Sequence, residues 1–168
     1  IRLGGLRWKA KTTNFSATYK VGAESLSRNS GLKLIEAKRL LSIYWKRNWA
    51  ILEVEKACTV KEIGAKKWLL NPISGFYYQL RAEKDRFSTL NQGTAVYVFD
   101  IWLAYIRKLG MRISFQYHDE FATNIKIGTE QWAKDIVNEA VRLTNEKLNL
   151  NIEIGCSIHF GGRYSSIH

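Results

Sequence analysis

Hydrophobic positions recur every three or four residues in several stretches of this chain, which is the spacing of one face of an α-helix. The stretches are residues 5–19, 32–57, 84–108 and 129–147. A break near Val21-Gly22 ends the first of them. The pattern therefore predicts four helices, of which the second and the third are the longest.

A different pattern covers residues 111–117, where apolar and polar residues alternate strictly, as they do in a half-buried strand. The tripeptide His118-Asp119-Glu120 interrupts the alternation, and a second strand pattern follows over residues 121–127. Two strands that are so close in sequence favour a hairpin. We therefore expect a hairpin with the acidic pair at its tip.

Two shorter patterns complete the predicted order of elements. Asn71-Pro72 and Ser74-Gly75 are typical of turns, and Phe76-Tyr77-Tyr78 follows them as a short strand. Residues 151–159 alternate again and predict a last strand. The order of helices, hairpin, helix and strand indicates an α+β protein in which helices pack on one face of a small antiparallel sheet.

The charge of the chain is positive and unevenly distributed. The 168 residues carry a formal net charge of +11, and residues 1–50 hold eleven basic and two acidic residues. A basic end on an otherwise balanced chain indicates a polyanionic partner, although a basic protein without such a partner fits the charge equally well. Cys58 and Cys156 lie far apart in sequence and show no metal-type spacing, so we interpret them as reduced core residues.

The composition also bears on location. No run of 18 apolar residues is present, so we expect no transmembrane helix, and the first residues lack the apolar core of a signal peptide. We therefore expect a cytoplasmic protein. The chain does not begin with Met, which agrees with a chain that begins inside a longer product.

Four residues of the first predicted helix are spaced four apart: Arg7, Lys11, Phe15 and Tyr19. Each step of four drifts by about 40°, so all of them lie within a sector of about 120°. This face presents two cations and then two aromatic rings, and a nucleoside triphosphate is likewise charged at one end and aromatic at the other. The alternative is an amphipathic helix in which Phe15 and Tyr19 belong to the core.

The run from Arg7 to Tyr19 resembles motif B of the family A DNA polymerases, the group of bacterial DNA polymerase I and the phage replicative enzymes. The resemblance implies that Arg7 and Lys11 hold the triphosphate. It also implies that Phe15 faces the sugar and that Tyr19 lies beside the templating base. The family usually has Gly where this chain has Lys20.

The predicted hairpin resembles motif C of the same family, in which the Asp of HDE binds the catalytic metal. The resemblance implies that Asp119 is a metal ligand, that Glu120 has a less direct catalytic role, and that His118 lies near the primer terminus. Without the resemblance, two acidic residues at an exposed turn are most often only solvated. A divalent cation is one way to relieve their mutual repulsion.

A third match, residues 87–95, resembles the helix that precedes motif C, where a Gln reaches the minor groove of the duplex. It implies that Gln92 contacts DNA, because an amide can both donate and accept there; a polar residue near a helix N-terminus is the alternative. The family commonly has Asn at the position of Ser88. Residues 161–168 are loosely similar to the family's carboxy terminus.

Together the motifs imply an incomplete right-hand polymerase fold, with residues 1–65 as part of the fingers and residues 66–168 as the carboxy-terminal part of the palm. The implied reaction is template-directed transfer of a nucleotide from a dNTP to a primer 3′ end on primer–template DNA. Lys11 is a candidate general acid toward pyrophosphate. The implied setting is a bacterial cell or a phage-infected host.

Two-metal phosphoryl transfer requires carboxylates that hold two Mg²⁺ ions about 4 Å apart. The family's other Asp precedes motif B, and residues 1–6 contain no acid. We therefore expect a fragment or a split polymerase that works with a companion polypeptide and is inactive without it. The alternatives are part of a single-subunit RNA polymerase, and a non-catalytic nucleic-acid-binding protein that retained the fold.

Overall fold

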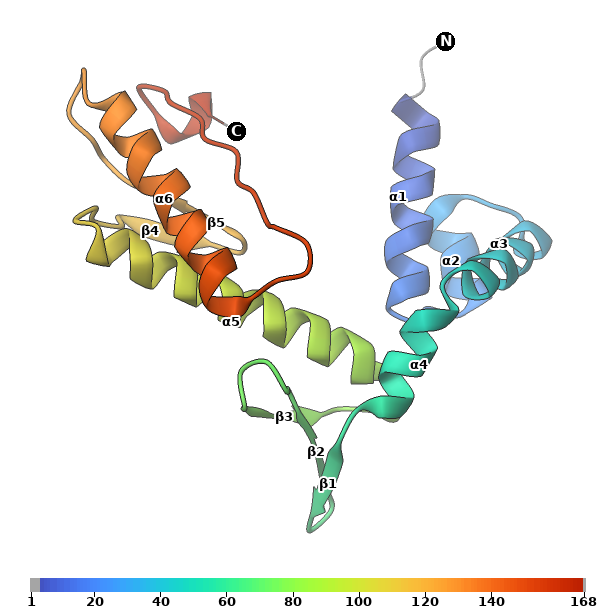
Figure 1. Cartoon of the computed structure of the whole chain (residues 1–168). Coiled ribbons are helices and arrows are strands. Elements are labelled where there is room, and N and C mark those ends of the chain that lie inside the picture. Colours follow the sequence, from blue (N-terminus) through green and yellow to red (C-terminus); the bar gives the residue numbers. More distant parts are fainter. Residues whose placement is uncertain (1–3, 168) are drawn as a thin grey trace. The chain divides into compact units, whose positions relative to one another are not determined.

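The computed structural model describes residues 4–167, with side chains from Arg7 onward, and confirms the α+β class (Figure 1). Helices alternate with two small antiparallel sheets, one of three strands and one of two. The chain divides into two compact units, the first ending at Thr94 and the second beginning at Ala95. This division lies about 30 residues after the predicted functional boundary at residue 65, and that boundary stays a prediction about roles.

Four helices begin the first unit: α1 (Gly4–Thr18), α2 (Ala23–Ser30), α3 (Leu34–Arg47) and α4 (Trp49–Ala57). The helix predicted over residues 5–19 is confirmed as α1, whereas the polar helix α2 was not predicted. The single helix predicted over residues 32–57 is wrong, because Asn48 divides it into α3 and α4. At this break the Tyr44 carbonyl accepts from both the backbone N–H and the side-chain amide of Asn48, each at 2.8 Å.

The first three helices pack through small and branched apolar residues. Ala17 of α1, Leu26 of α2 and Ala37 of α3 are completely buried. Across the same contact the hydroxyl groups of Thr18 and Tyr44 lie 2.7 Å apart. One face of α1 is therefore held against α2 and α3, and its opposite face is left to solvent.

A three-stranded antiparallel sheet follows, made of β1 (Val60–Ile63), β2 (Lys66–Leu70) and β3 (Tyr77–Leu80). The predicted turns after β2 and the strand that follows them are confirmed. Leu69 and Leu80 are buried on one face of this sheet, and that face packs against the next helix. Gly93 allows close approach at this contact, because a β-carbon there would lie 2.9 Å from the Tyr78 ring.

The predicted helix over residues 84–108 is confirmed as a short 3₁₀ turn, Glu83–Asp85, and the long helix α5 (Arg86–Lys108). In the second unit α5 is followed by the hairpin of β4 (Phe115–Tyr117) and β5 (Glu120–Ala122), then by α6 (Glu130–Leu148) and a 3₁₀ turn, Tyr164–Ser166. The hairpin and α6 confirm the sequence prediction. Both strands are shorter than predicted, although Ser114 still donates its backbone N–H to Ala122 at 2.9 Å.

The core of the second unit lies between α5 and α6. It consists of buried residues from the end of α5, the segment after it and the inner face of α6, namely Ile106, Met111, Ala133, Ile136, Val137 and Ala140. Phe121 of the hairpin and Cys156 pack against this cluster. Cys58 and Cys156 are free and half-buried, and burial raises the pKa of both thiols.

The strand predicted over residues 151–159 is wrong. The segment runs without regular structure after α6, because no strand of the described chain pairs with it. Instead, the side-chain amide of Asn145 donates to the Ile154 carbonyl and accepts from the Ile154 N–H, both at 2.9 Å. One side chain of α6 thus satisfies the backbone groups of Ile154 that a neighbouring strand would otherwise satisfy.

Candidate functional site

The face of α1 predicted to bind a triphosphate is exposed. Arg7 and Lys11 lie in solvent, and the Phe15 side chain is 53% exposed. The alternative in which Phe15 belongs to the core is therefore wrong, and Tyr19 is half-buried. The Lys11 ammonium lies 5.7 Å from the centroid of the Phe15 ring, which stacks on Tyr19 with centroids 6.5 Å apart and planes inclined by 18°. Cations and rings thus form one continuous stripe.

The end of α1 explains how the chain accommodates Lys20 where the resemblance leads us to expect Gly. Lys20 is left-handed, with φ of 53°. Its N–H donates to the Ala17 carbonyl at 2.9 Å, and the Val21 N–H donates to the Ser16 carbonyl at 2.8 Å. These two bonds form a Schellman motif, whose left-handed position is most often Gly. The helix therefore ends with the expected backbone geometry, with Lys in place of Gly.

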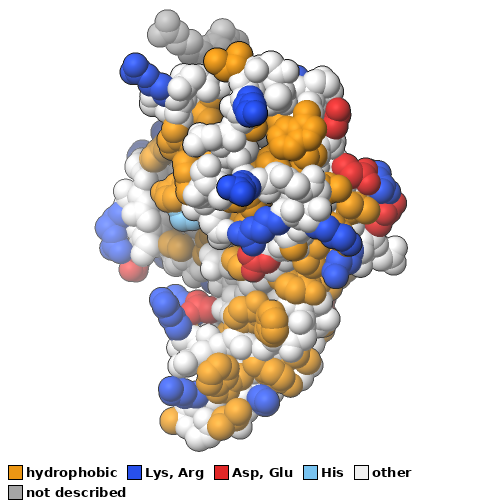
Figure 2. Space-filling model, turned by 90° about the vertical axis from the view of Figure 1, so that its left-hand side faces the viewer, with side chains coloured by type: hydrophobic (Ala, Val, Ile, Leu, Met, Phe, Trp, Pro, Cys, Tyr) orange, Lys and Arg blue, Asp and Glu red, His pale blue; other side chains and the backbone are white. Residues whose placement is uncertain are grey.

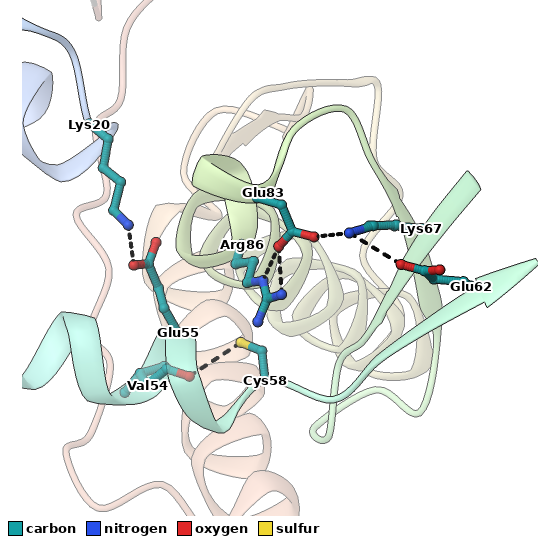
Figure 3. A network of polar contacts seen from close by, with 8 residues as sticks. All are labelled: Lys20, Val54, Glu55, Cys58, Glu62, Lys67, Glu83 and Arg86. Carbon is teal, nitrogen blue, oxygen red and sulfur yellow. Dashed lines mark hydrogen bonds and ion pairs between the residues drawn. The ribbon is translucent and has the colours of Figure 1, made fainter. Parts of the chain in front are cut away.

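A buried carboxylate partners the Lys20 side chain. Its ammonium forms an ion pair with Glu55 of α4, whose side chain is almost completely buried (Figure 3). Glu55 Oε1 has no hydrogen-bond partner among the described residues, so Lys20 is its principal charge compensation. This contact ties the aromatic end of the α1 stripe to α4. The sequence analysis did not identify Glu55. The one sequence feature that could have pointed to an acidic partner is Lys20, which stands where the resemblance leads us to expect Gly.

The structure brings together two of the predicted nucleic-acid contacts. The Gln92 side chain of α5 is exposed, and its amide nitrogen lies 3.5 Å from the Tyr19 hydroxyl. These residues belong to different predicted motifs and are 73 positions apart in sequence. Gln92 is not capping a helix N-terminus, since α5 begins six residues earlier at Arg86. At the start of α5, the Ser88 hydroxyl donates a hydrogen bond to the Asp85 carbonyl at 3.0 Å.

The predicted metal ligand lies at the tip of the hairpin. His118 and Asp119 form the two-residue turn, while Tyr117 pairs with Glu120 across the ladder. His118 has φ of 53°, a positive value that such turns require and that His adopts more readily than branched residues. Its ring lies 4.3 Å from the Tyr117 ring. Asp119 is exposed, so its carboxylate is accessible to a cation.

The second acid of the hairpin already has a partner. The Tyr164 hydroxyl donates to Glu120 at 2.6 Å, and the Tyr164 ring meets Phe115 edge to face at 5.0 Å. The hydrogen bond to the Glu120 carboxylate raises the pKa of Tyr164 to about 12. The two acids thus differ in their surroundings: Glu120 is half-buried and bound by the carboxy-terminal turn, whereas Asp119 faces solvent. The sequence resemblance covered residues 161–168 as a segment but did not predict a role for Tyr164 within it. His168, the last residue of that segment, lies outside the described residues.

The hairpin tip carries the type of oxygen ligand that a divalent cation could use. Carboxylate oxygens are the ligands that Mg²⁺ prefers, and Asp119 offers two of them. Within residues 4–167 no three His, Cys, Asp or Glu side chains are grouped so that they could hold a metal ion.

The predicted site residues fall into the two units. Arg7, Lys11, Phe15, Tyr19 and Gln92 belong to the first unit, and His118, Asp119 and Glu120 belong to the second. Within each unit the residues predicted to act together lie near one another.

Two further observations concern the described chain as a whole. None of its helices is long and apolar enough to cross a membrane. In comparisons with known proteins, no family model matches the chain and no curated protein matches its sequence.

Proposed function

We propose that this chain is the nucleotide-binding and carboxy-terminal part of a family A DNA polymerase. It acts in template-directed nucleotidyl transfer from a dNTP to a primer 3′ end, in the cytoplasm of a bacterial or phage-infected cell. The observation that carries the proposal is the exposed stripe of α1, which ends at Tyr19 beside Gln92. A helix that merely covered a core would bury its aromatic residues, whereas here the Phe15 ring is exposed like the two cations before it.

The stripe has the chemistry that a dNTP requires. Arg7 can contact phosphate oxygens with two parallel N–H donors, and Lys11 adds a point charge one helical turn further on. The Phe15 ring comes next, where a sugar or base would follow the phosphates. Lys11 also has a proton to give to the leaving pyrophosphate. Tyr19 ends the stripe and is the residue we assign to the template, and Gln92 beside it is the one we assign to the duplex.

The hairpin supplies the metal-binding part of the proposal. Asp119 would hold Mg²⁺, which when bound neutralises phosphate charge and positions the primer hydroxyl. Because Tyr164 holds Glu120, we assign Glu120 to supporting the hairpin beside Asp119. A two-ion site needs a carboxylate beyond this pair, and we propose that a companion polypeptide provides it. His118, at the same turn, is assigned to the primer terminus.

The native complex is the material for the test, isolated through a tag on this chain. We expect it to extend a primer in Mg²⁺, and Asp119→Ala to lower the rate by about 100-fold or more, since metal-held charge contributes several kcal/mol. Asp135→Ala removes an exposed acid of α6 and is the matched control, with activity unchanged. If the Asp119→Ala complex extended the primer as fast as the Asp135→Ala control, the assignment of Asp119 as a metal ligand would be wrong.

The two alternatives give different results in the same assay. A single-subunit RNA polymerase would use ribonucleotides in preference to deoxyribonucleotides. A non-catalytic nucleic-acid-binding protein would bind primer–template without extending it, and Asp119→Ala would leave that binding unchanged. The presence of both the Arg7–Lys11 pair and the Asp119–Glu120 pair favours a polymerase, because a protein that only binds DNA has no need for both.

A further inference from the structure

We propose that the open face of the sheet β1–β2–β3 binds single-stranded DNA. Side chains alternate between the two faces of a strand, and cross-strand partners share a face. The register therefore assigns the residues of β1, β2 and β3 to two sets. One set contains Leu69, Tyr78 and Leu80, and packs against α5. The other contains Lys61, Ile63, Lys66, Trp68, Tyr77 and Gln79.

The charges of the sheet are separated between its faces. On the covered face Lys67 lies 3.2 Å from Glu62 and also forms an ion pair with Glu83, so that its charge is compensated (Figure 3). On the open face Lys61 and Lys66 form no ion pair with any described residue, and no acidic residue of the three strands shares that face. Arg81 follows β3 directly and is also exposed. The open face is therefore basic and uncompensated.

Aromatic rings are interleaved with these cations. The Lys61 ammonium lies 3.8 Å from the centroid of the Tyr77 ring, and Tyr77 is 41% exposed. Trp68 lies opposite Lys61 in the register and is half-buried. At the bottom of Figure 2, where the turn between β1 and β2 lies, the visible coloured side chains are hydrophobic or basic.

This combination matches an unpaired polynucleotide better than it matches other polyanions. Cations that track a backbone and rings that stack on bases are the two components of sequence-tolerant single-strand binding. In a duplex the bases are already stacked on one another, so the rings would contribute little. An acidic protein would use the cations but would leave the rings without a flat partner. The proposal does not depend on catalysis and would hold for a chain that only binds DNA.

The first test uses the full chain and a fluorescent dT oligonucleotide, with affinity read from anisotropy at several salt concentrations. The double variant Lys61→Gln/Lys66→Gln should lower the slope of log K against log salt by about 1.4, since each phosphate contact contributes about 0.7. The control Lys38→Gln/Lys46→Gln removes two exposed charges from α3, and its slope should stay nearer that of the wild type. Equal losses from both pairs would overturn the proposal.

The second test isolates stacking. Tyr77→Leu should weaken binding to dT about tenfold and leave duplex binding unchanged, because base–ring stacking is lost only with unpaired bases. Trp49→Leu removes an exposed ring from α4 as the control, with dT affinity unchanged. Thermal unfolding by circular dichroism shows that each variant is folded. Unchanged dT affinity in Tyr77→Leu would overturn the proposal. It would also be overturned if Lys61→Gln/Lys66→Gln lowered the affinity for a poly-Glu peptide but left the affinity for dT unchanged.

Discussion

The exposed stripe of α1 and the tip of the β4–β5 hairpin both combine charged and aromatic residues, but they are built differently. The stripe takes its geometry from the helix itself, because residues four apart lie on one face whatever surrounds them. The hairpin has three residues in each strand, and such a small ribbon is marginally stable alone. It is supported from outside, by Trp102 against Phe121 and by Tyr164 on Glu120.

In the α1 stripe, we expect substitutions to affect the proposed binding without affecting stability. At the β4–β5 hairpin, we expect them to affect both. Arg7, Lys11 and Phe15 of the α1 stripe can be changed at little cost to folding, since their side chains face solvent. Changes around the hairpin affect both the packing of the second unit and the position of Asp119.

The same substitution in the two regions gives the sharpest contrast. Phe121 packs on the core of the second unit, with its ring 5.1 Å from Trp102, so Phe121→Ala should lower the free energy of unfolding by about 2 kcal/mol or more. Phe15→Ala should change it by less than about 0.5 kcal/mol. Urea denaturation measures both, and similar losses would contradict the comparison.

A nucleotide-binding effect without a stability effect is expected for Lys11. Lys11→Ala should lower kcat/KM for dNTPs in the native complex by about tenfold or more, because charge-assisted contacts contribute about 1.5–3 kcal/mol. Lys9→Ala is the matched control. Lys9 is also exposed, and its side chain lies about 160° around the helix axis from that of Lys11. Equal kinetics of the two variants would show that the stripe does not bind the triphosphate.

The anchor of the stripe can be tested separately. Lys20→Gly relieves a left-handed conformation that costs about 1–2 kcal/mol, but it leaves the buried Glu55 without its cation. We expect a net loss of about 1 kcal/mol in the free energy of unfolding. Adding Glu55→Gln should recover most of it, because the uncompensated charge is then gone. A double variant no more stable than Lys20→Gly alone would indicate that the ion pair contributes little.

The smallest effect concerns Tyr164 and its dependence on pH. The hydrogen bond to Glu120 favours the protonated phenol and raises its pKa from 10.0 to about 12. A raised pKa means that the bond's contribution to folding is complete below about pH 10 and is lost as the pH rises to 12. The stability difference between the wild type and Tyr164→Phe should therefore shrink across this window. Absorbance titration should show one late-titrating tyrosine, which Tyr164→Phe removes.

Sequence patterns predicted α1, α5, α6 and the hairpin well because these elements follow local periodicity. Residues 5–19 and 129–147 have a clear helical period, and both helices are confirmed. The strands β1 and β2 were not predicted, because Lys and Glu occupy most of their exposed positions and hide the alternation. The break at Asn48 was missed because hydrophobic residues continue at helical spacing on both sides of it, so the pattern shows no interruption there.

At the candidate site too, local patterns predicted features of single elements but not contacts between distant parts of the chain. Exposure of Arg7, Lys11 and Asp119 was expected from spacing and turn chemistry. The partners Glu55 and Tyr164 were not, because each lies more than 30 residues from the residue that it contacts. Such contacts depend on tertiary packing, so a motif can identify the reacting residues and still leave their supports unknown.

The paired hydrogen bonds between Asn145 and Ile154 have a consequence for hydrogen exchange. Residues 151–159 lack regular structure and are mostly exposed, so their amide protons should exchange with solvent within the time of a short deuterium pulse. The Ile154 amide should be an exception, because its proton is held by a side chain of the well-packed helix α6. One slow amide in an otherwise fast segment would then report the opening of α6, from a position outside the helix.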